Sequence, residues 1–260
     1  MLIRIAYLGT NYCGYQVQPN GPSVQAEINR AAEALFGHPC DIVGCSRTDS
    51  GVHANDFCAT VAARGTDELR TDIPAGRVPQ ALSAHLPDDI RVFAAEWVPS
   101  GFHARYDVQE KEYLYRIYNR RVFSPFEVGR AWHVPQEMDA EALARMKAAA
   151  SAFPGTRDFS AFMAKGSKVT DPVRTVTRAE VTREGDLILF RVAANGFLYN
   201  MVRIMVGTLV DVAQGRLDPA DLPDVIASRD RDRTGQTAPA CGLYLDRVTY
   251  PVTKNSQGFL

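Results

Sequence analysis

The sequence predicts an α+β protein built from two similar domains, each with a sheet backed by helices. Short apolar runs with strand spacing and longer helical stripes alternate in mixed order through both halves of the chain. Pro99, Ser100 and Gly101 interrupt this alternation, as a linker would. A length of 260 residues with 46% apolar residues is enough for two cores of moderate size. We therefore expect one domain over residues 1–100 and a second over residues 101–260.

In the first half, short apolar runs predict four strands, over residues 2–7, 40–45, 57–63 and 90–98. Ser23 is expected to cap a helix over residues 24–36, where an apolar residue recurs at every fourth position until Gly37 ends the pattern. The same spacing starts again at Val78 and predicts a second helix over residues 78–86.

In the second half, the expected strands are those of residues 112–118, 173–182, 187–193 and 242–250. A turn at Gly185 should join the middle two as a hairpin. Asp139 is expected to cap an alanine-rich helix over residues 139–153. A long apolar helix over residues 197–214 should end at Gly215.

The composition is that of an ordinary globular protein, with 23% charged residues. The chain does not open with a basic and then an apolar segment, so no signal peptide is expected. The longest apolar segment, residues 197–212, contains Asn200, Arg203 and Asp211 and is too short and too polar to cross a membrane. Five cysteines without a Cys-x-x-Cys pair favour reduced thiols over disulfides or zinc. We therefore expect a cytoplasmic protein that has no membrane segment.

Basic charge is concentrated in the second half of the chain. Residues 1–100 hold seven Arg, no Lys and eleven acidic residues, a net charge of −4, whereas residues 101–260 have a net charge of +3. Arginine makes up 24 of the 29 basic residues, and its planar group suits bidentate contacts to phosphate. Genome composition explains the same bias at least as well, so the ratio is weak evidence for a polyanionic partner.

A polar loop over residues 44–54 lies between two apolar runs, where functional side chains are often carried on a rigid scaffold. Arg47 and Asp49 stand two residues apart in it, with a glycine on either side. Asp49 is suited to act as a nucleophile, a base or an ion-pair partner, and an Asp that only caps its own turn is the alternative. Because the loop holds no second carboxylate, it does not suggest a two-carboxylate mechanism.

Other polar residues also stand in informative surroundings. Arg203 interrupts an otherwise apolar run, and a buried arginine needs a partner unless its side chain reaches solvent from the helix edge. Tyr113 and Tyr115 alternate along an expected strand and share one of its faces, as ordinary core aromatics also do. His53 follows Asp49 by four residues, but no third ligand has a suitable spacing, so no metal is expected.

The loop around Asp49 resembles the signature loop of the TruA family, tRNA pseudouridine synthase A. The matching residues are Arg47-Thr48-Asp49-Ser50-Gly51-Val52-His53. Further matches follow in the family's order along the chain: Gly9-Thr10-Asn11-Tyr12, Gly14-Tyr15-Gln16, Ser23-Val24-Gln25, Leu86-Pro87-Asp88-Asp89-Ile90, Phe102-His103-Ala104-Arg105, Lys111-Glu112-Tyr113-Leu114-Tyr115, Arg174-Thr175-Val176, Asn195-Gly196-Phe197-Leu198-Tyr199-Asn200-Met201-Val202-Arg203 and Gly242-Leu243-Tyr244-Leu245. The sequence departs from the family pattern at Leu8, at Tyr15 and in a longer loop over residues 167–172.

The resemblance implies a fold, a reaction and a set of site residues. In this family two domains place their sheets on either side of a central active-site cleft. The implied reaction converts uridine to pseudouridine at nucleotides 38, 39 and 40 in the anticodon stem-loop of tRNA. Asp49 would be the covalent nucleophile, Arg203 would pair with it and keep it ionised, and Tyr113 would stack on the extruded base. Arg47 would contact the RNA backbone or occupy the space that the base leaves.

The resemblance also implies partners. The reaction adds no group from outside, so we expect no cofactor and no metal. The family is dimeric, and a homodimer would concentrate the positive charge of two second halves around the tRNA. The arginines expected to contact phosphates are Arg105, Arg116, Arg120 and Arg121.

Two other functions are compatible with parts of this pattern. A non-catalytic RNA-binding protein on the same fold would bind tRNA without turnover. A metal-dependent hydrolase using Asp49 and His53 would lose its activity to a chelator. The sequence leaves open whether Asp49 attacks C6 of the base or C1′ of the sugar, and whether the Tyr113 hydroxyl moves a proton.

Overall fold

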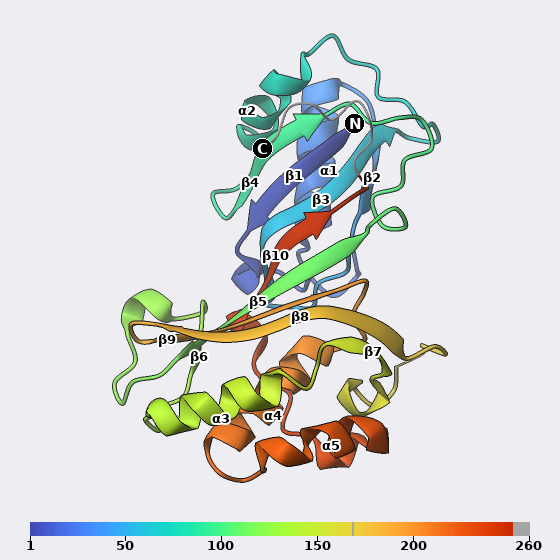
Figure 1. Cartoon of the computed structure of the whole chain (residues 1–260). Helices are drawn as coiled ribbons and strands as arrows, with labels where there is room; N and C mark the ends of the chain where they lie inside the picture. The colour runs from blue at the N-terminus through green and yellow to red at the C-terminus, as the bar shows by residue number, and fades with distance from the viewer. Residues whose placement is uncertain (168, 252–260) are drawn as a thin grey trace. The chain divides into compact units, whose positions relative to one another are not determined.

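The computed structural model describes residues 1–167 and 169–251 (Figure 1). The chain forms two compact units, Met1–Lys111 together with the chain from Leu245, and Glu112–Tyr244. Most of the last strand, from Leu245 on, therefore belongs with the first unit, a return of the chain that the expected division at residue 100 does not include. Of the loop expected over residues 167–172, Lys168 lies outside the described residues.

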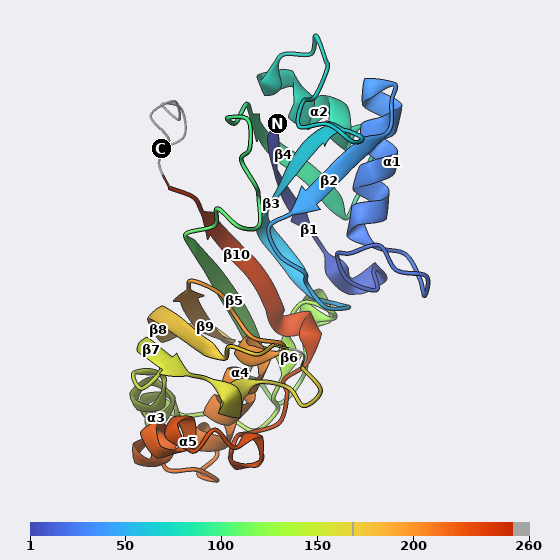
Figure 2. The ribbon, with the colours of Figure 1, turned by 90° about the vertical axis from the view of Figure 1, so that its right-hand side faces the viewer.

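The first unit holds a sheet with two helices on one face (Figure 2). Its strands are β1 (Leu2–Tyr7), β2 (Cys40–Gly44), β3 (His53–Ala63), β4 (Ile90–Glu96) and β10 (Leu243–Thr249). Their order is β4, β1, β3, β10, with β2 also paired to β3. β1 runs antiparallel to both β3 and β4. The helices are α1 (Val24–Phe36) and α2 (Val78–Ser83).

Helix α1 begins and ends where the sequence predicts. The Ser23 hydroxyl accepts a hydrogen bond from the backbone N–H of Ala26 at 3.3 Å, which satisfies one free donor of the first turn. Gly37 follows the last turn with φ of 71°, a left-handed conformation that glycine adopts without strain. Ile28 on the buried face of α1 and Phe57 on β3 are both fully buried and belong to the core of this unit.

The second unit has the same two layers with more helix. Its strands are β5 (Glu110–Tyr118), β6 (Trp132–His133), β7 (Gly155–Asp158), β8 (Val173–Glu184) and β9 (Leu187–Ala194). They lie in the order β5, β9, β8, β7, and β6 pairs in parallel with β5. The helices α3 (Ala140–Ala150), α4 (Met201–Ala213) and α5 (Leu222–Ser228) lie together on one side of this sheet (Figure 1).

Strands β8 and β9 form the predicted hairpin. Glu184 pairs with Leu187, and Gly185 in the turn has φ of 60°. Behind the hairpin, the fully buried rings of Phe153 and Phe162 meet edge to face with their centroids 5.3 Å apart. These aromatic contacts mark the core between the sheet and the helices.

Helix α4 begins at Met201, four residues later than the sequence predicts. The cause is Asn200, which has φ of 59° in the left-handed region and so cannot lie inside a right-handed helix. The residues before it stay in a loop, where the side chain of Tyr199 is 51% exposed. The expected helix over residues 78–86 is also shorter, because α2 ends at Ser83.

The α+β class is confirmed, since each unit combines a sheet with helices on one of its faces. In the part of the chain that the structure describes, no helix is both long and apolar enough to span a membrane.

Candidate active site

The loop that carries Asp49 connects β2 to β3 and is closed at both ends by main-chain hydrogen bonds. At its start, the N–H of Cys45 donates to the carbonyl of Cys58 at 2.8 Å. At its end, the N–H of Val52 donates to the carbonyl of Asp49 itself at 3.1 Å. Gly51 between them has φ of 77°, which the tight turn requires. The backbone of Asp49 is therefore part of a formed turn.

Thr48, directly before Asp49, is the main anchor of the loop. Its side chain is buried and its hydroxyl shares a hydrogen bond of 2.8 Å with the hydroxyl of Tyr7 on β1. Its carbonyl accepts a hydrogen bond from the N–H of Tyr15 at 3.1 Å. One residue further on, Ser50 donates through its hydroxyl to the carbonyl of Tyr12 at 3.2 Å. β1 and the segment after it thus hold the residues on both sides of Asp49, which fixes the backbone from which its carboxyl group extends.

Two glycines allow this close approach. A Cβ atom at Gly14 would lie 2.7 Å from the carbonyl oxygen of Thr48, and Gly14 has φ of 102°, where other residues are strained. A Cβ atom at Gly44 would lie 2.6 Å from the Tyr15 ring and 2.7 Å from the Phe57 ring. Those two rings are stacked with centroids 4.1 Å apart, so they form a rigid floor beneath the start of the loop.

His53 has a structural role in this arrangement. Its ring is fully buried, and its Nδ1 accepts a hydrogen bond from the backbone N–H of Gly9 at 2.9 Å. The lone pair on Nδ1 is therefore used inside the protein. Among the described residues, His, Cys, Asp and Glu side chains nowhere gather in a group of three or more that could hold a metal ion. The Asp49 and His53 pair does not form part of such a group.

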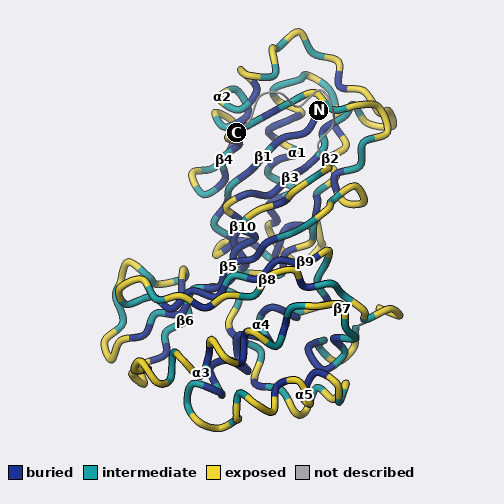
Figure 3. Tube along the Cα trace, viewed as in Figure 1, coloured by how far each residue is buried: buried dark blue, intermediate teal, exposed yellow. Residues whose placement is uncertain are grey.

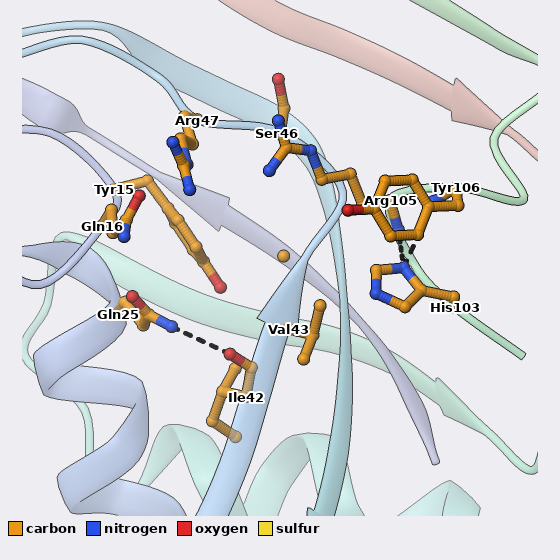
Figure 4. Close-up of a pocket in the computed structure, with 11 residues that line it drawn as sticks. Tyr15, Gln16, Gln25, Ile42, Val43, Ser46, Arg47, His103, Arg105 and Tyr106 are labelled. Atoms are coloured by element: carbon orange, nitrogen blue, oxygen red, sulfur yellow. Dashed lines mark hydrogen bonds between the residues drawn. The ribbon is translucent and has the colours of Figure 1, made fainter. Parts of the chain in front are cut away.

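The side chains of the loop differ in exposure. Asp49 is half-buried and Arg47 is exposed. Within the described residues, the Arg47 guanidinium makes no ion pair and no side-chain hydrogen bond. It lines a hollow of about 240 Å³ together with Arg105 and Tyr106 (Figure 4). This volume is below the ~300–1,000 Å³ of typical ligand pockets, so the hollow suits one group of a larger ligand.

In the second unit, Tyr113 lies buried on β5 beside a ring that fixes its orientation. Its side chain is 7% exposed, and Phe197 meets it edge on with the ring centroids 5.0 Å apart. Tyr115, two residues along the same strand, is fully buried and donates through its hydroxyl to the carbonyl of Pro239 at 2.7 Å. Tyr115 is thus a core residue, whereas Tyr113 lies next to the loop that precedes α4.

Arg203 emerges from a helix that is buried along most of its length (Figure 3). Its Nε donates to the carbonyl of Ala238 at 2.7 Å, and its Nη1 donates to the side-chain oxygen of Asn200 at 2.8 Å. Burial raises the pKa of Tyr115 and of Cys241, and the positive charge of Arg203 opposes both shifts. Arg203 is half-buried, and the oxygens of Ala238 and Asn200 hold its guanidinium in place.

The remaining arginines expected to bind phosphate fall into two groups. Arg116 donates two hydrogen bonds to the Glu127 carboxylate, at 3.0 and 2.8 Å, and the Nε of Arg120 contacts Asp186 at 2.6 Å. Arg105 and Arg121 are exposed and have no ion pair within the described residues. Arg105 lines the same hollow as Arg47 and Ser46, so the structure places it beside the Asp49 loop.

Sequence reasoning missed the residues that hold the loop. Tyr7 and Gly9 belong to a different segment, and only the pairing of Tyr7 with Ala54 on β3 places them beside Thr48 and His53. Asn200 was also missed as the side chain that holds Arg203. Its spacing of three residues before an arginine in a helix was the available signal.

A family model described as tRNA pseudouridine synthase matches residues 3–107 and 149–251. The chain belongs to this family. The match includes the Asp49 loop, the hollow beside it and the α4 helix with Arg203. It therefore confirms the family that the residues around Asp49 resemble, and with it an enzyme of the isomerase class.

Similar pseudouridine synthases match this chain over nearly its whole length. tRNA pseudouridine synthase A of Acetivibrio thermocellus is 45% identical over 246 residues, which cover 95% of this chain and 97% of that protein. The protein of the same name from Moorella thermoacetica is 45% identical over 250 residues, which cover 95% and 98%. Among solved structures, a chain of "Crystal Structure of a Cbf5-Nop10-Gar1 Complex" aligns over 80% of this chain and 53% of that chain at 13% identity. Its TM-score of 0.33 is too low to show a shared fold.

Proposed function

We propose that this protein converts uridine to pseudouridine in tRNA, with Asp49 as the covalent nucleophile. Membership of the tRNA pseudouridine synthase family supports the reaction. The observation that carries the assignment of Asp49 is its place in a loop anchored on both sides, with Thr48 buried directly before it. A carboxylate whose backbone is fixed in this way loses little conformational freedom when it attacks a substrate.

The reaction is an isomerisation, and its atoms balance without an outside reagent. The bond between C1′ and N1 breaks, the uracil turns, and a bond forms between C1′ and C5. The proton on C5 is lost and N1 gains a proton. Attack by Asp49 at C6 and attack at C1′ both require an ionised carboxylate.

The other site residues would assist this step. Arg203 is proposed to keep Asp49 ionised, since a cation near a carboxyl group favours its charged form. The buried ring of Tyr113 is proposed to stack on the uracil and to move the C5 proton through its hydroxyl. Arg47, exposed and without an ion pair among the described residues, is proposed to help extrude the nucleotide.

The proposed targets are nucleotides 38, 39 and 40 of the anticodon stem-loop. The support is the resemblance to tRNA pseudouridine synthase A and the high identity to proteins of that name. Because a base stacked in RNA cannot turn about its sugar, the target nucleotide has to leave the stack first. The proposed place of action is the cytoplasm, where tRNA is available.

The experiment is a tritium-release assay. Unmodified tRNA that carries tritium at C5 of uridine is incubated with the protein, with and without a chelator. We expect release of tritium to water in both cases, and pseudouridine only at nucleotides 38, 39 and 40. Binding of tRNA without release would instead identify a non-catalytic RNA-binding protein. Release that the chelator abolishes would contradict a mechanism that needs no metal.

A further inference from the structure

A small loop beside the Asp49 loop is closed around its own histidine. The Nδ1 of His103 accepts hydrogen bonds from the backbone N–H groups of Arg105 at 3.1 Å and of Tyr106 at 3.3 Å. The carboxylate of Asp107 accepts a hydrogen bond from the N–H of His103 at 2.8 Å. The buried Ala104 accepts a hydrogen bond from the Tyr250 hydroxyl at 2.6 Å through its carbonyl. The loop is therefore rigid, and it fixes the directions of Arg105 and Tyr106.

Tyr106 presents an aromatic ring to solvent from this loop. Its side chain is 75% exposed, which is unusual for an aromatic residue. The ring rests on that of His103, with centroids 4.2 Å apart and planes inclined by 30°. Within the described residues its hydroxyl makes no hydrogen bond. A ring that is supported from below and open above is suited to stack on a planar group.

Two arginines that make no ion pair among the described residues line the same hollow. Figure 4 shows the side chain of Arg105 reaching from its loop toward Ser46, with Arg47 on the same hollow. Burial lowers the pKa of Lys111, and the positive charge of Arg105 adds to this shift while Cys45 opposes it, so Lys111 lies within range of the charge of Arg105. None of these three cations has an ion pair among the described residues. Cations that lack a carboxylate partner in this way are typical of an anion site.

We propose that the hollow is a subsite for a second nucleotide of the RNA, one that is not isomerised. Its unpaired base stacks on Tyr106, and its phosphodiester binds Arg105 and Arg47. The nucleotide is a near neighbour of the target in the strand, because Arg47 is two residues from Asp49. The proposal rests on the proposed function for the identity of the ligand, since RNA is the polyanion that offers both a phosphate and a stacking face.

The test measures binding, so that it is independent of turnover. The probe is an unmodified anticodon stem-loop RNA, together with a series in which one loop nucleotide at a time is abasic. The protein variants are Tyr106→Ala, Tyr106→Phe and Arg105→Gln. Phe126→Ala is the control for loss of an exposed ring, because Phe126 is 84% exposed, and Arg77→Gln is the control for loss of an exposed charge.

We expect Tyr106→Ala to weaken binding of the intact RNA about tenfold or more, as for loss of one stacked base. Tyr106→Phe and Phe126→Ala should bind as the wild type does. One abasic position should weaken binding to the wild type by the same factor and should have no further effect on Tyr106→Ala, because the two changes remove one interaction. Arg105→Gln should lower the slope of log K against log salt by about 1, and Arg77→Gln should leave it unchanged.

Three results would overturn the subsite. They are equal binding by Tyr106→Ala, additive effects of Tyr106→Ala with every abasic position, and a lower mass of Tyr106→Ala in light scattering. The last result would show that Tyr106 contacts a second copy of the chain. Tritium release by the wild type is measured in parallel. Absence of tritium release would refute the proposed function. The binding measurements would still show whether the subsite exists.

Discussion

Two roles are proposed for Tyr113, stacking by its ring and proton transfer by its hydroxyl, and two substitutions distinguish them. Tyr113→Phe keeps the ring that packs against Phe197, whereas Tyr113→Ala removes both ring and hydroxyl. We expect the Phe variant to be nearly as inactive as the Ala variant, because the hydroxyl is proposed to move the proton from C5. Single-turnover rates on the same tRNA measure the difference. A Phe variant with most of the wild-type rate would mean that the residue only stacks.

Tyr115→Phe is the matched control for this pair. It removes a buried hydroxyl from the same strand, and with it the hydrogen bond to Pro239. We expect a loss of about 1 kcal/mol in the free energy of unfolding and a nearly normal single-turnover rate.

Arg203→Met tests whether a fixed cation supports the nucleophile. Methionine keeps an apolar stem in the buried helix but loses the charge and the bonds to Ala238 and Asn200. We expect turnover to fall more than stability, and to fall further at acidic pH, because Asp49 would then be protonated more readily. The pH profile of the single-turnover rate checks this. Normal turnover at neutral pH would contradict the ion pair.

The control for Arg203→Met is Arg145→Met in the same unit. Arg145 also donates two hydrogen bonds to carbonyls, those of Val212 and Leu217, but it belongs to none of the site segments. We expect both variants to lose a comparable amount of stability and only Arg203→Met to lose turnover. This result would show that Arg203 acts in catalysis and not only in packing.

At the scale of elements, the contact between the Gly14 segment and the Asp49 loop is open to test. Gly14→Ala forces a side chain onto φ of 102° and brings its Cβ close to the carbonyl of Thr48. We expect a loss of about 1–3 kcal/mol in the free energy of unfolding and a lower turnover, because Thr48 positions Asp49. Thermal unfolding and single-turnover rates measure the two effects.

Two other glycines serve as controls that separate the two causes of the Gly14→Ala effect, which are backbone strain and the contact with Thr48. Gly65 has φ of 75° with open space around it, so Gly65→Ala reports backbone strain alone. Gly76 has neither a positive φ nor a near neighbour, so Gly76→Ala should be close to neutral. If Gly65→Ala lowers turnover as much as Gly14→Ala does, the contact with Thr48 does not position the nucleophile.

The elements that the sequence predicts well are those with strong local signals. Helix α1 has a capping serine, a regular apolar face and a terminal glycine, and its observed ends match. The strand β6, with two residues, and the helix α5, with seven, are too short to show a period. The start of α4 was misplaced because the left-handed conformation of Asn200 is set by its surroundings and leaves no periodic trace.

The sequence predicts the residues of the candidate site but not the residues that anchor the Asp49 loop. Asp49 and Arg47 stand out locally as polar residues in a loop between strands. The anchors of that loop come from β1 and the segment after it, and their contacts depend on how β1 registers against β3, which includes an irregularity between Ile5 and Tyr7. Such a register is a property of the folded sheet.

At the scale of the whole molecule, the charge distribution leads to a prediction about assembly. With a net charge of −1, a single chain has a weak long-range field for a polyanion. We predict a homodimer, in which two second halves with their excess of basic residues act on one tRNA, and a steep loss of affinity with salt. Light scattering and tRNA titrations over a range of salt concentrations test the two parts separately. A monomer mass at working concentration would contradict the first, and a salt-independent affinity the second.

Tritium release from C5-labelled tRNA measures whether Asp49 carries out the isomerisation. Asp49→Asn is compared with the wild type and with Asp41→Asn, which changes an exposed aspartate on the neighbouring strand. We predict that Asp49→Asn binds tRNA within a few-fold of the wild type and releases tritium more slowly by a factor of roughly 10⁴ or more, while Asp41→Asn behaves as the wild type. Readily measured release by Asp49→Asn would show that Asp49 is not the nucleophile.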